Sequence, residues 1–412
     1  MAKNRIQQIC NALKDWSSQP FLPDAKPDLK KRKKQKALPP NQLPWRLNIT
    51  PYRVYISEMM LQQTRVSTVI NYFQRWMVLF PNWEKLSQSS LTEILSCWQG
   101  LGYYSRAERI HKVAQILKKS NFLLPKTKKE LLKLPGVGEY TANAILSLAY
   151  GQKVLAFDAN LKRVAARLLG LDQTENKKTE QALSDFLKQF LPFLPAPDLN
   201  SILMDFGRLL CTARFPQCEP CPLQKHCLGF QKNKSPFPAL AAQKLPSKKL
   251  ILADLHFFLV QKNEKILMQQ ARKNAWWVNL YSFPYSLQPE TKEQNQLTSS
   301  VQSKQKGDSS HFFLKMPSPF SFLHLPYQAE GFVTKYKLKI SLFFMDIPEE
   351  NKNFPFPSLE KKAEQDKKFL WIHREEFFSL PMPSPMQKIS LWLKQQGWPE
   401  KITQFVPERK IF

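Results

Sequence analysis

Four cysteines in the order C-x6-C-x2-C-x5-C constrain this chain more than any other feature. Cys211, Cys218, Cys221 and Cys227 are four of only six cysteines in 412 residues, and such bunching in a long chain argues against a disulfide framework. Four-cysteine zinc sites usually combine two close pairs, and here only Cys218 and Cys221 form one. The unequal spacing therefore favours an iron–sulfur cluster, with zinc as the alternative.

The charge of the chain indicates an anionic partner. A formal net charge of +28 points to a polyanion, which is either nucleic acid or an anionic membrane surface. Lysines are scattered throughout, so a general lysine bias contributes to this excess. No apolar run approaches the ~20 residues that span a bilayer, and residues 1–13 lack the apolar core of a signal peptide. We therefore expect no membrane partner and a cytoplasmic protein, associated with the nucleoid if the source is bacterial.

Composition along the chain divides it into two domains. Residues 1–230 carry helical periodicity with almost no strand signal, and are interrupted at about 17–42 by a basic, proline-rich insertion. Residues 231–249 form a Lys/Pro/Ser linker. Residues 250–400 form a smaller α+β domain that closes with a helix near 386–396. Its expected strands are apolar segments bounded by polar loops, at 251–261, 265–270, 332–345 and 369–373.

A short glycine turn separates two helical stretches. Gly136, Val137 and Gly138 follow Leu134-Pro135, and the glycines let backbone amides approach a partner closely. The helix that follows adds its positive N-terminal end, an arrangement that binds phosphate without reading base sequence. An ordinary turn between helices is the alternative, but the basic chain favours a phosphate clamp.

Two carboxylic acids lie in contrasting sequence environments. Glu58 stands between Ile56 and Met59, where apolar neighbours would raise the pKa of a buried acid. Asp158 precedes a helix that begins near Asn160, where an N-cap aspartate is kept ionised. One neutral and one anionic carboxyl group are what glycosidic bond cleavage requires. An exposed helical Glu58 and a purely structural N-cap are the alternatives.

The motifs taken together resemble the helix-hairpin-helix DNA glycosylase superfamily and, within it, the MutY-type adenine glycosylases. The resemblance implies an all-α glycosylase domain with one 4Fe–4S cluster on the loop 211–227. It is carried by the four cysteines and by motifs in the family's order, namely Leu43–Arg46, Ser57–Thr64, Gly100–Ala107, Leu134–Ala142 and Met204–Gly207.

The resemblance also implies a reaction and its residues. Adenine is flipped out of the duplex, Glu58 protonates its N7, and ionised Asp158 stabilises the sugar cation. Tyr140 and Asn160 match positions that hydrogen-bond around the aspartate and the sugar. The remaining positions contact the base or the duplex: Trp45 and Arg46 line the adenine pocket, and Gln62 and Tyr103 enter the base stack.

Two rival functions remain. The bifunctional endonuclease III branch uses a lysine nucleophile where this chain has Tyr140, whose phenol cannot form an imine, and lacks a glutamate at the position of Glu58. A DNA-binding relative without catalysis would need none of Glu58, Tyr140 and Asp158. The sequence therefore favours a monofunctional, monomeric adenine glycosylase.

The resemblance weakens in two places. Ala159 stands where the family has glycine in Asp-Gly-Asn, which restricts the backbone beside the catalytic aspartate. The C-terminal domain resembles the Nudix-like recognition domain of the family only in part, and Thr334 is its candidate contact to 8-oxoguanine. The expected substrate is double-stranded DNA with adenine opposite 8-oxoguanine or guanine.

Overall fold

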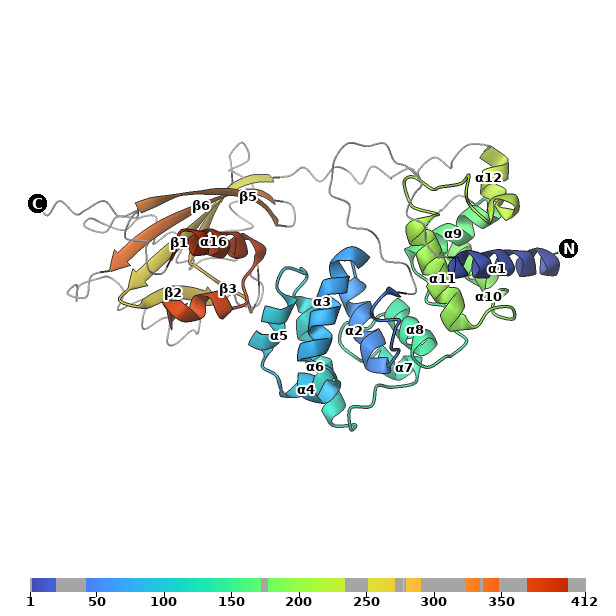
Figure 1. Cartoon of the computed structure of the whole chain (residues 1–412), viewed down its shortest axis with the longest axis horizontal. Helices are drawn as coiled ribbons and strands as arrows, with labels where there is room; N and C mark the ends of the chain where they lie inside the picture. The colour runs from blue at the N-terminus through green and yellow to red at the C-terminus, as the bar shows by residue number, and fades with distance from the viewer. Residues whose placement is uncertain are drawn as a thin grey trace, which may run out of the picture. The chain divides into compact units, whose positions relative to one another are not determined.

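The structure, a computed structural model, describes residues 2–19, 42–171, 177–233, 251–270, 277, 279–289, 323–333, 336–347 and 369–398. These residues fall into two compact units, one helical and one built on a sheet (Figure 1). The basic segment 20–41 and most of the expected linker lie outside the described residues. The predicted fold class is confirmed at this level: a helical domain followed by an α+β domain with a mixed sheet.

The helical unit contains long helices joined by short turns. Local capping explains where several helices begin, because Thr50 and Asp158 each accept a hydrogen bond from a backbone amide three residues ahead. Thr127 and Glu130 form a capping box at the start of α7. The helices are α1 (Ala2–Ser18), α2 (Pro51–Leu61), α3 (Val66–Leu79), α4 (Trp83–Gln88), α5 (Leu91–Trp98), α6 (Ser105–Lys118), α7 (Lys128–Leu131), α8 (Glu139–Leu148), α9 (Ala159–Leu169), α10 (Lys177–Lys188), α11 (Ala196–Leu209), η2 (Gln224–His226) and α12 (Leu228–Asn233).

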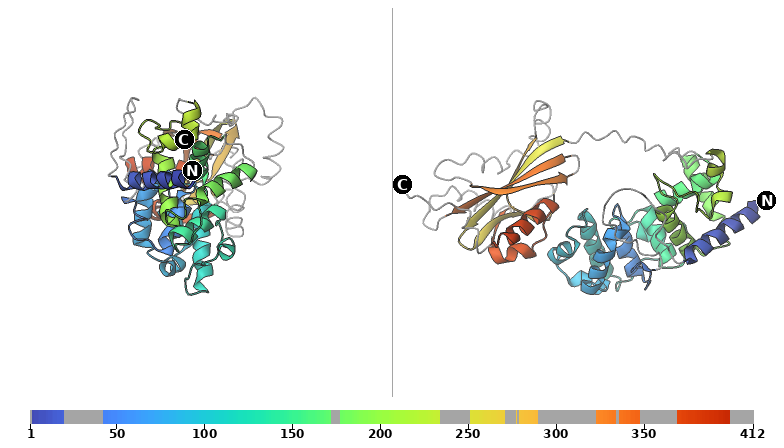
Figure 2. Two further views of the ribbon diagram at one scale, coloured as in Figure 1. Left: turned by 90° about the vertical axis from the view of Figure 1, so that its right-hand side faces the viewer. Right: turned by 45° about the horizontal axis from the view of Figure 1, so that its top comes forward.

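One half of this unit packs around α9, with the N-terminal helix against α11. Helices α1, α9, α10 and α11 gather at the same end of the unit in both views (Figures 1 and 2). Their apolar faces form one core that includes Leu13, Leu161, Phe190 and Leu199, all fully buried. The start of α9, which carries Asp158, is therefore fixed against α11 by a packed core rather than by a loop.

The helical hairpin joins α7 to α8. Gly136 has a φ of +83°, and a Cβ there would lie 2.7 Å from the Cδ of Arg109 and 3.0 Å from the Cε of Met59. Glycine is thus required both by conformation and by close packing. Gly138 is the N-cap of α8, so the hairpin delivers the chain to the helix that carries Tyr140.

In the sheet unit the described residues form seven strands, in the order β3-β2-β1-β6-β5, with β4 paired to β1 and β7 paired to β2. Strands β1 and β6 are parallel along their whole length, and the other pairs are antiparallel. Helix α16 covers one face of the sheet through Met386, Ile389 and Leu393. The elements are β1 (Ile251–Lys262), β2 (Lys265–Gln270), β3 (Tyr281–Ser282), β4 (Tyr285–Pro289), β5 (Leu323–Val333), β6 (Tyr336–Ile347), β7 (Phe369–His373), η3 (Arg374–Ser379) and α16 (Ser384–Gln395).

One expected strand is wrong. The segment 332–345 was expected to form a single strand, but the chain reverses within it, because Val333 pairs with Tyr336 in the antiparallel β5–β6 register. The intervening residues include no glycine, asparagine or proline, so the usual hairpin signal is missing.

Among the described residues, no helix is long and apolar enough to cross a membrane.

Candidate active site

A cavity of about 790 Å³ opens within the helical unit. It is lined by the segment before α2, by α2, α3, α8 and α11, and by the start of α9. This volume is within the range of pockets that bury a small ligand. The cavity brings together six of the residues expected at the active site: Trp45, Arg46, Glu58, Tyr140, Asp158 and Asn160.

Glu58 lies on α2 and is 5% exposed. Its Oε2 is buried and has no hydrogen-bond partner. Burial raises the pKa of Glu58 to about 7, because a desolvated carboxyl group disfavours the charged form. A hydrogen bond from the hydroxyl of Tyr140 and the positive charge of Arg46 each lower the pKa of Glu58, and the negative charge of Asp158 raises it. Glu58 therefore has a proton to give near neutral pH.

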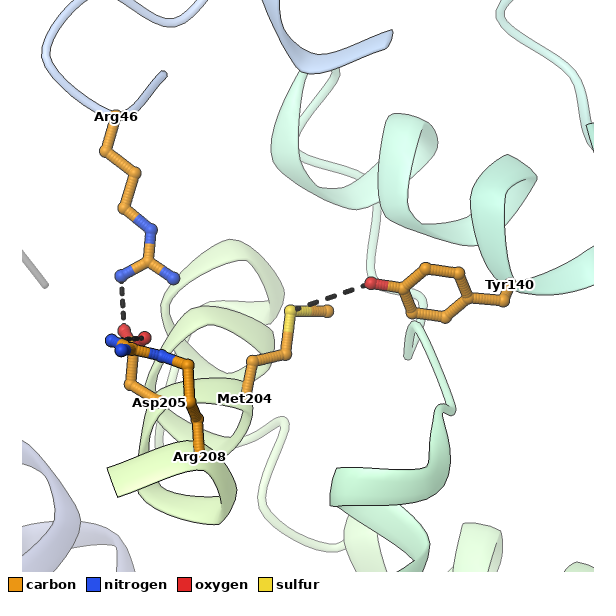
Figure 3. A network of polar contacts seen from close by, with 5 residues as sticks. All are labelled: Arg46, Tyr140, Met204, Asp205 and Arg208. Carbon is orange, nitrogen blue, oxygen red and sulfur yellow. Dashed lines mark hydrogen bonds and ion pairs between the residues drawn. The ribbon is translucent and has the colours of Figure 1, made fainter. Parts of the chain in front are cut away.

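Tyr140 lies on α8 beside the same carboxyl group. Burial raises the pKa of Tyr140 well above its ordinary value, and the negative charges of Glu58 and Asp158 raise it further. Its hydroxyl points toward the sulfur of Met204 at 3.9 Å (Figure 3). Tyr140 is thus a neutral phenol and carries no amine that could attack a sugar.

Asp158 is the N-cap of α9. Its Oδ1 accepts a hydrogen bond from the backbone amide of Leu161 at 2.8 Å, and its Oδ2 accepts one from Nδ2 of Asn160 at 2.7 Å. The positive end of α9 and these two donors favour a negative carboxylate. Ala159 occupies the first helical position and is exposed, so the helix accommodates its methyl group.

Close packing of α9 on α11 positions Asn160. A Cβ on Gly207 would lie 2.8 Å from the Cβ of Asn160, so the contact requires glycine. The Nη2 of Arg163 donates to Oδ1 of Asn160 and to the carbonyl of Gly207, both at 2.8 Å. Arg163 also donates through Nε to the carbonyl of Cys211 at 3.0 Å.

Sequence reasoning gave Asp205 no role, yet it lies in the cavity wall. Its carboxylate is paired with the guanidinium groups of Arg46 and Arg208 (Figure 3). The available signal was an acid within the apolar face of α11, in the motif that begins at Met204. Its partner Arg46 is 159 residues away in sequence, which no local pattern indicates.

The residues expected to contact DNA lie outside the cavity lining. Gln62 follows α2, and its Nε2 lies 3.5 Å from the carbonyl of Gly136 and 3.4 Å from Oγ1 of Thr141. Tyr103 is 60% exposed and has a φ of +49°. Val137 is buried within the hairpin, so of these positions Tyr103 presents the most open side chain. Thr334 lies outside the described residues.

The end of α2 is held by a buried arginine that sequence reasoning did not single out. Nη1 of Arg106 donates to the carbonyls of Met59, Met60 and Gln62 at 3.1, 2.7 and 2.6 Å. A guanidinium at a helix C-terminus satisfies carbonyls that have no partner within the helix. Arg106 therefore fixes the turn between Glu58 and Gln62.

The four clustered cysteines line a second, much smaller cavity of about 30 Å³. None of them is in a disulfide. Nη1 of Arg167 donates to Sγ of Cys211 at 3.2 Å, and burial raises the pKa of Cys221 to about 12. Within the part of the chain that the structure describes, no three His, Cys, Asp or Glu side chains gather around a point where a single metal ion could bind, so the four cysteines line the cavity without meeting at one ion-sized site.

Comparison with known proteins places these residues in context. Residues 56–189 match the HhH-GPD superfamily of base excision DNA repair proteins. Two adenine DNA glycosylases of Buchnera aphidicola are each 38% identical to the chain. The protein from subspecies Baizongia pistaciae matches over 59% of this chain and 68% of its own length, and that from Schizaphis graminum over 59% and 70%. A thermostable thymine-DNA glycosylase structure is 27% identical, with a TM-score of 0.46 over 56% of this chain and all of its own.

Proposed function

The chain belongs to the adenine DNA glycosylase family, and we propose that Glu58 and Asp158 are the acid and the anion that cleave the glycosidic bond of adenine. The family's enzymes are monofunctional glycosylases of base excision repair, and this chain acts on DNA as they do. One observation supports the two roles above all: a buried Glu58 with an unpartnered oxygen shares a cavity with Asp158.

The first step is proton transfer to the base. Adenine cannot react inside the stack, so the target nucleotide is flipped into the cavity, where Trp45 and Arg46 form part of the wall. Glu58 donates its proton to N7, which makes the base a cation. The C1′–N9 bond then breaks, and its electron pair goes to the base, which leaves as neutral adenine. The raised pKa of Glu58 suits this step, because an acid near the working pH both holds and releases its proton.

The second step is stabilisation and capture of the sugar cation. The carboxylate of Asp158, oriented by Leu161 and Asn160, stabilises the positive charge that develops on the deoxyribose. Water then adds to C1′ and loses a proton, which leaves an abasic site. Tyr140 stays neutral and offers no amine, so the reaction forms no imine and ends without strand cleavage.

We propose that the base opposite adenine is 8-oxoguanine or guanine, and that the sheet unit is a divergent Nudix-like recognition domain. The mixed sheet covered by α16 supports this proposal. So does the segment Trp277–Pro284, which resembles the motif Trp-Gly-Gly-Leu-Tyr-x-Phe-Pro of the family's recognition domain except that both glycines are replaced. A single-turnover assay tests it with duplexes that differ only in the base opposite one adenine. We expect alkali-dependent cleavage to be faster opposite 8-oxoguanine than opposite thymine. Equal rates would contradict the selectivity, and borohydride trapping of a covalent product would contradict the monofunctional mechanism.

The four cysteines suit a 4Fe–4S cluster. They come from one short loop, converge on one cavity, and are all reduced. Arg167 donates to Cys211, as expected beside a sulfur that bears negative charge. Cys211, Cys218, Cys221 and Cys227 would hold the cluster, which when bound supplies a covalent clamp on the loop after α11. No proton or electron of the excision reaction needs it.

Replacing Cys221 by serine should remove the cluster. We expect loss of absorbance near ~400 nm and of about four iron atoms per chain, together with a lower melting temperature. Cys97→Ser is the matched control, because Cys97 is also buried but lies outside the cluster loop. Equal iron content in the two variants would contradict the assignment, and zinc in the parental protein would replace it with a zinc site.

A further inference from the structure

A buried ion-pair network forms one wall of the active-site cavity (Figure 3). The side chain of Asp205 is 5% exposed, while those of Arg46 and Arg208 are 23% and 25% exposed. Oδ2 of Asp205 accepts from Nη1 of Arg46, and Oδ1 accepts from Nη2 of Arg208 at 3.1 Å. A carboxylate with this little exposure is retained where cations compensate it, and here each of its two oxygens pairs with a separate guanidinium group.

Arg46 has no helix of its own to fix it. It belongs to a turn before α2, in which its amide donates to the carbonyl of Leu43 at 2.8 Å. The side chain reaches from this turn to α11, where it meets Asp205 (Figure 3). The ion pair therefore holds the guanidinium against α11 within the cavity.

The position of this guanidinium matters because Glu58 has an unpartnered oxygen in the same cavity. A guanidinium that donated to Oε2 would make a charge-assisted hydrogen bond and hold Glu58 as a carboxylate. A carboxylate cannot protonate adenine. In the structure Arg46 instead pairs with Asp205, and it affects Glu58 only through its positive charge.

We propose that Asp205 is a positioning residue that retains Arg46 on the α11 side of the cavity and thereby keeps Glu58 available as a proton donor. The proposal rests on the role of Glu58 as the acid. Asp205 acts through Arg46, because the charges that bear on Glu58 are those of Asp158 and Arg46.

The other charged groups around Glu58 either have partners of their own or lie at other points around it. Asp158 is held by the start of α9, and Arg106 of α6 is held by the carbonyls at the end of α2. Arg109 of α6 packs its stem against Gly136, and Arg65 lines the cavity at the start of α3. Arg46 differs from these groups because it pairs with a buried carboxylate, Asp205, in the cavity wall.

The test is the pH dependence of single-turnover adenine excision by full-length Asp205→Asn. In this variant Arg46 loses its anion and pairs with Glu58. The basic limb of the profile should then move to lower pH by about 1 to 3 units, with excision above the limb falling about tenfold per unit and recovering in acid. A basic limb at the parental pH in the folded variant would overturn the proposal. A structural defect alone would lower the rate at every pH without moving the limb.

Two further variants separate the contributions. Arg46→Gln with Asp205→Asn removes the competing cation, so its basic limb should return at least to the parental pH. Asp205→Glu keeps a carboxylate and should keep the parental limb. If Asp205→Asn does not fold, the pH profile of Arg46→Gln is compared with that of the double variant. Basic limbs at the same pH support the action of Asp205 through Arg46. A basic limb at lower pH in the double variant overturns it.

Arg208→Gln is the matched control for loss of a charge from the network. It leaves Arg46 on Asp205, so the basic limb should stay in place even where the rate changes. A shift as large as that of Asp205→Asn would overturn the specific role of Arg46. Glu58→Gln separates failure of the proposed function from failure of this inference. Excision by Glu58→Gln at the parental rate would refute Glu58 as the acid. If Glu58→Gln loses excision but the basic limb of Asp205→Asn stays at the parental pH, only the role of Asp205 is refuted.

Discussion

Replacement of Glu58 by glutamine should abolish adenine excision while binding to mismatched DNA persists. Glutamine has nearly the same shape and fits the same buried site, but it cannot donate a proton to the base. General acid catalysis contributes about 10²- to 10⁴-fold, so the single-turnover rate should fall by at least that range. The measurement is the rate of alkali-sensitive site formation on a duplex with one adenine opposite 8-oxoguanine, beside a binding isotherm on the same duplex.

The pH profile of the parental protein provides the companion observation. Because Glu58 must be protonated to act, excision should decline as pH rises through about 7, its pKa in the folded protein. Glu84→Gln is the control, since Glu84 is an exposed residue in the first turn of α4 outside the cavity. A Glu58→Gln variant that excises adenine at the parental rate would show that the proton comes from another group.

Replacement of Asp158 by asparagine should remove charge without removing the helix cap. Asparagine is as effective an N-cap as aspartate, so its oxygen can still accept from the amide of Leu161. The stability of α9 should therefore be retained, while the sugar cation loses its anionic partner. We expect excision to fall about 10²- to 10³-fold, the loss associated with one electrostatic contact to a transition state. Single-turnover rates and thermal melts on the same preparations measure the two properties separately.

Asp158→Ala completes the comparison. Alanine removes both the charge and the cap, so it should add a loss of about 1 kcal/mol in unfolding free energy to the catalytic defect. Asp158→Asn should also lower the pKa of Glu58, because the negative charge of Asp158 contributes to raising it. If Asp158→Asn were destabilised as much as Asp158→Ala and kept parental excision, Asp158 would be only a helix cap.

Features set by neighbours in the chain were accessible from sequence. Thr127 caps α7 by accepting from the amide of Glu130, Gly170 ends α9 with a φ of +63°, and β2 spans the expected residues 265–270. Each depends on contacts within a few residues or on simple alternation of apolar side chains. The spacing of the cysteines likewise indicated a candidate ligand set on one loop, and the family motifs led to the residues that share the cavity.

Features set by distant contacts were decided by the tertiary structure. The parallel pairing of β1 with β6 and the ion pair of Arg46 with Asp205 join segments far apart in sequence, for which no local pattern exists. The environment of Glu58 was likewise open, because an acid on a helix can be exposed or buried with the same neighbours. Packing of α3, α6 and α8 against α2 removed water from the carboxyl group of Glu58, and that desolvation raised its pKa. Sequence therefore indicated which side chains we propose for the chemistry, and only the fold decided their environment and partners, because desolvation and Coulomb energy depend on distances in space.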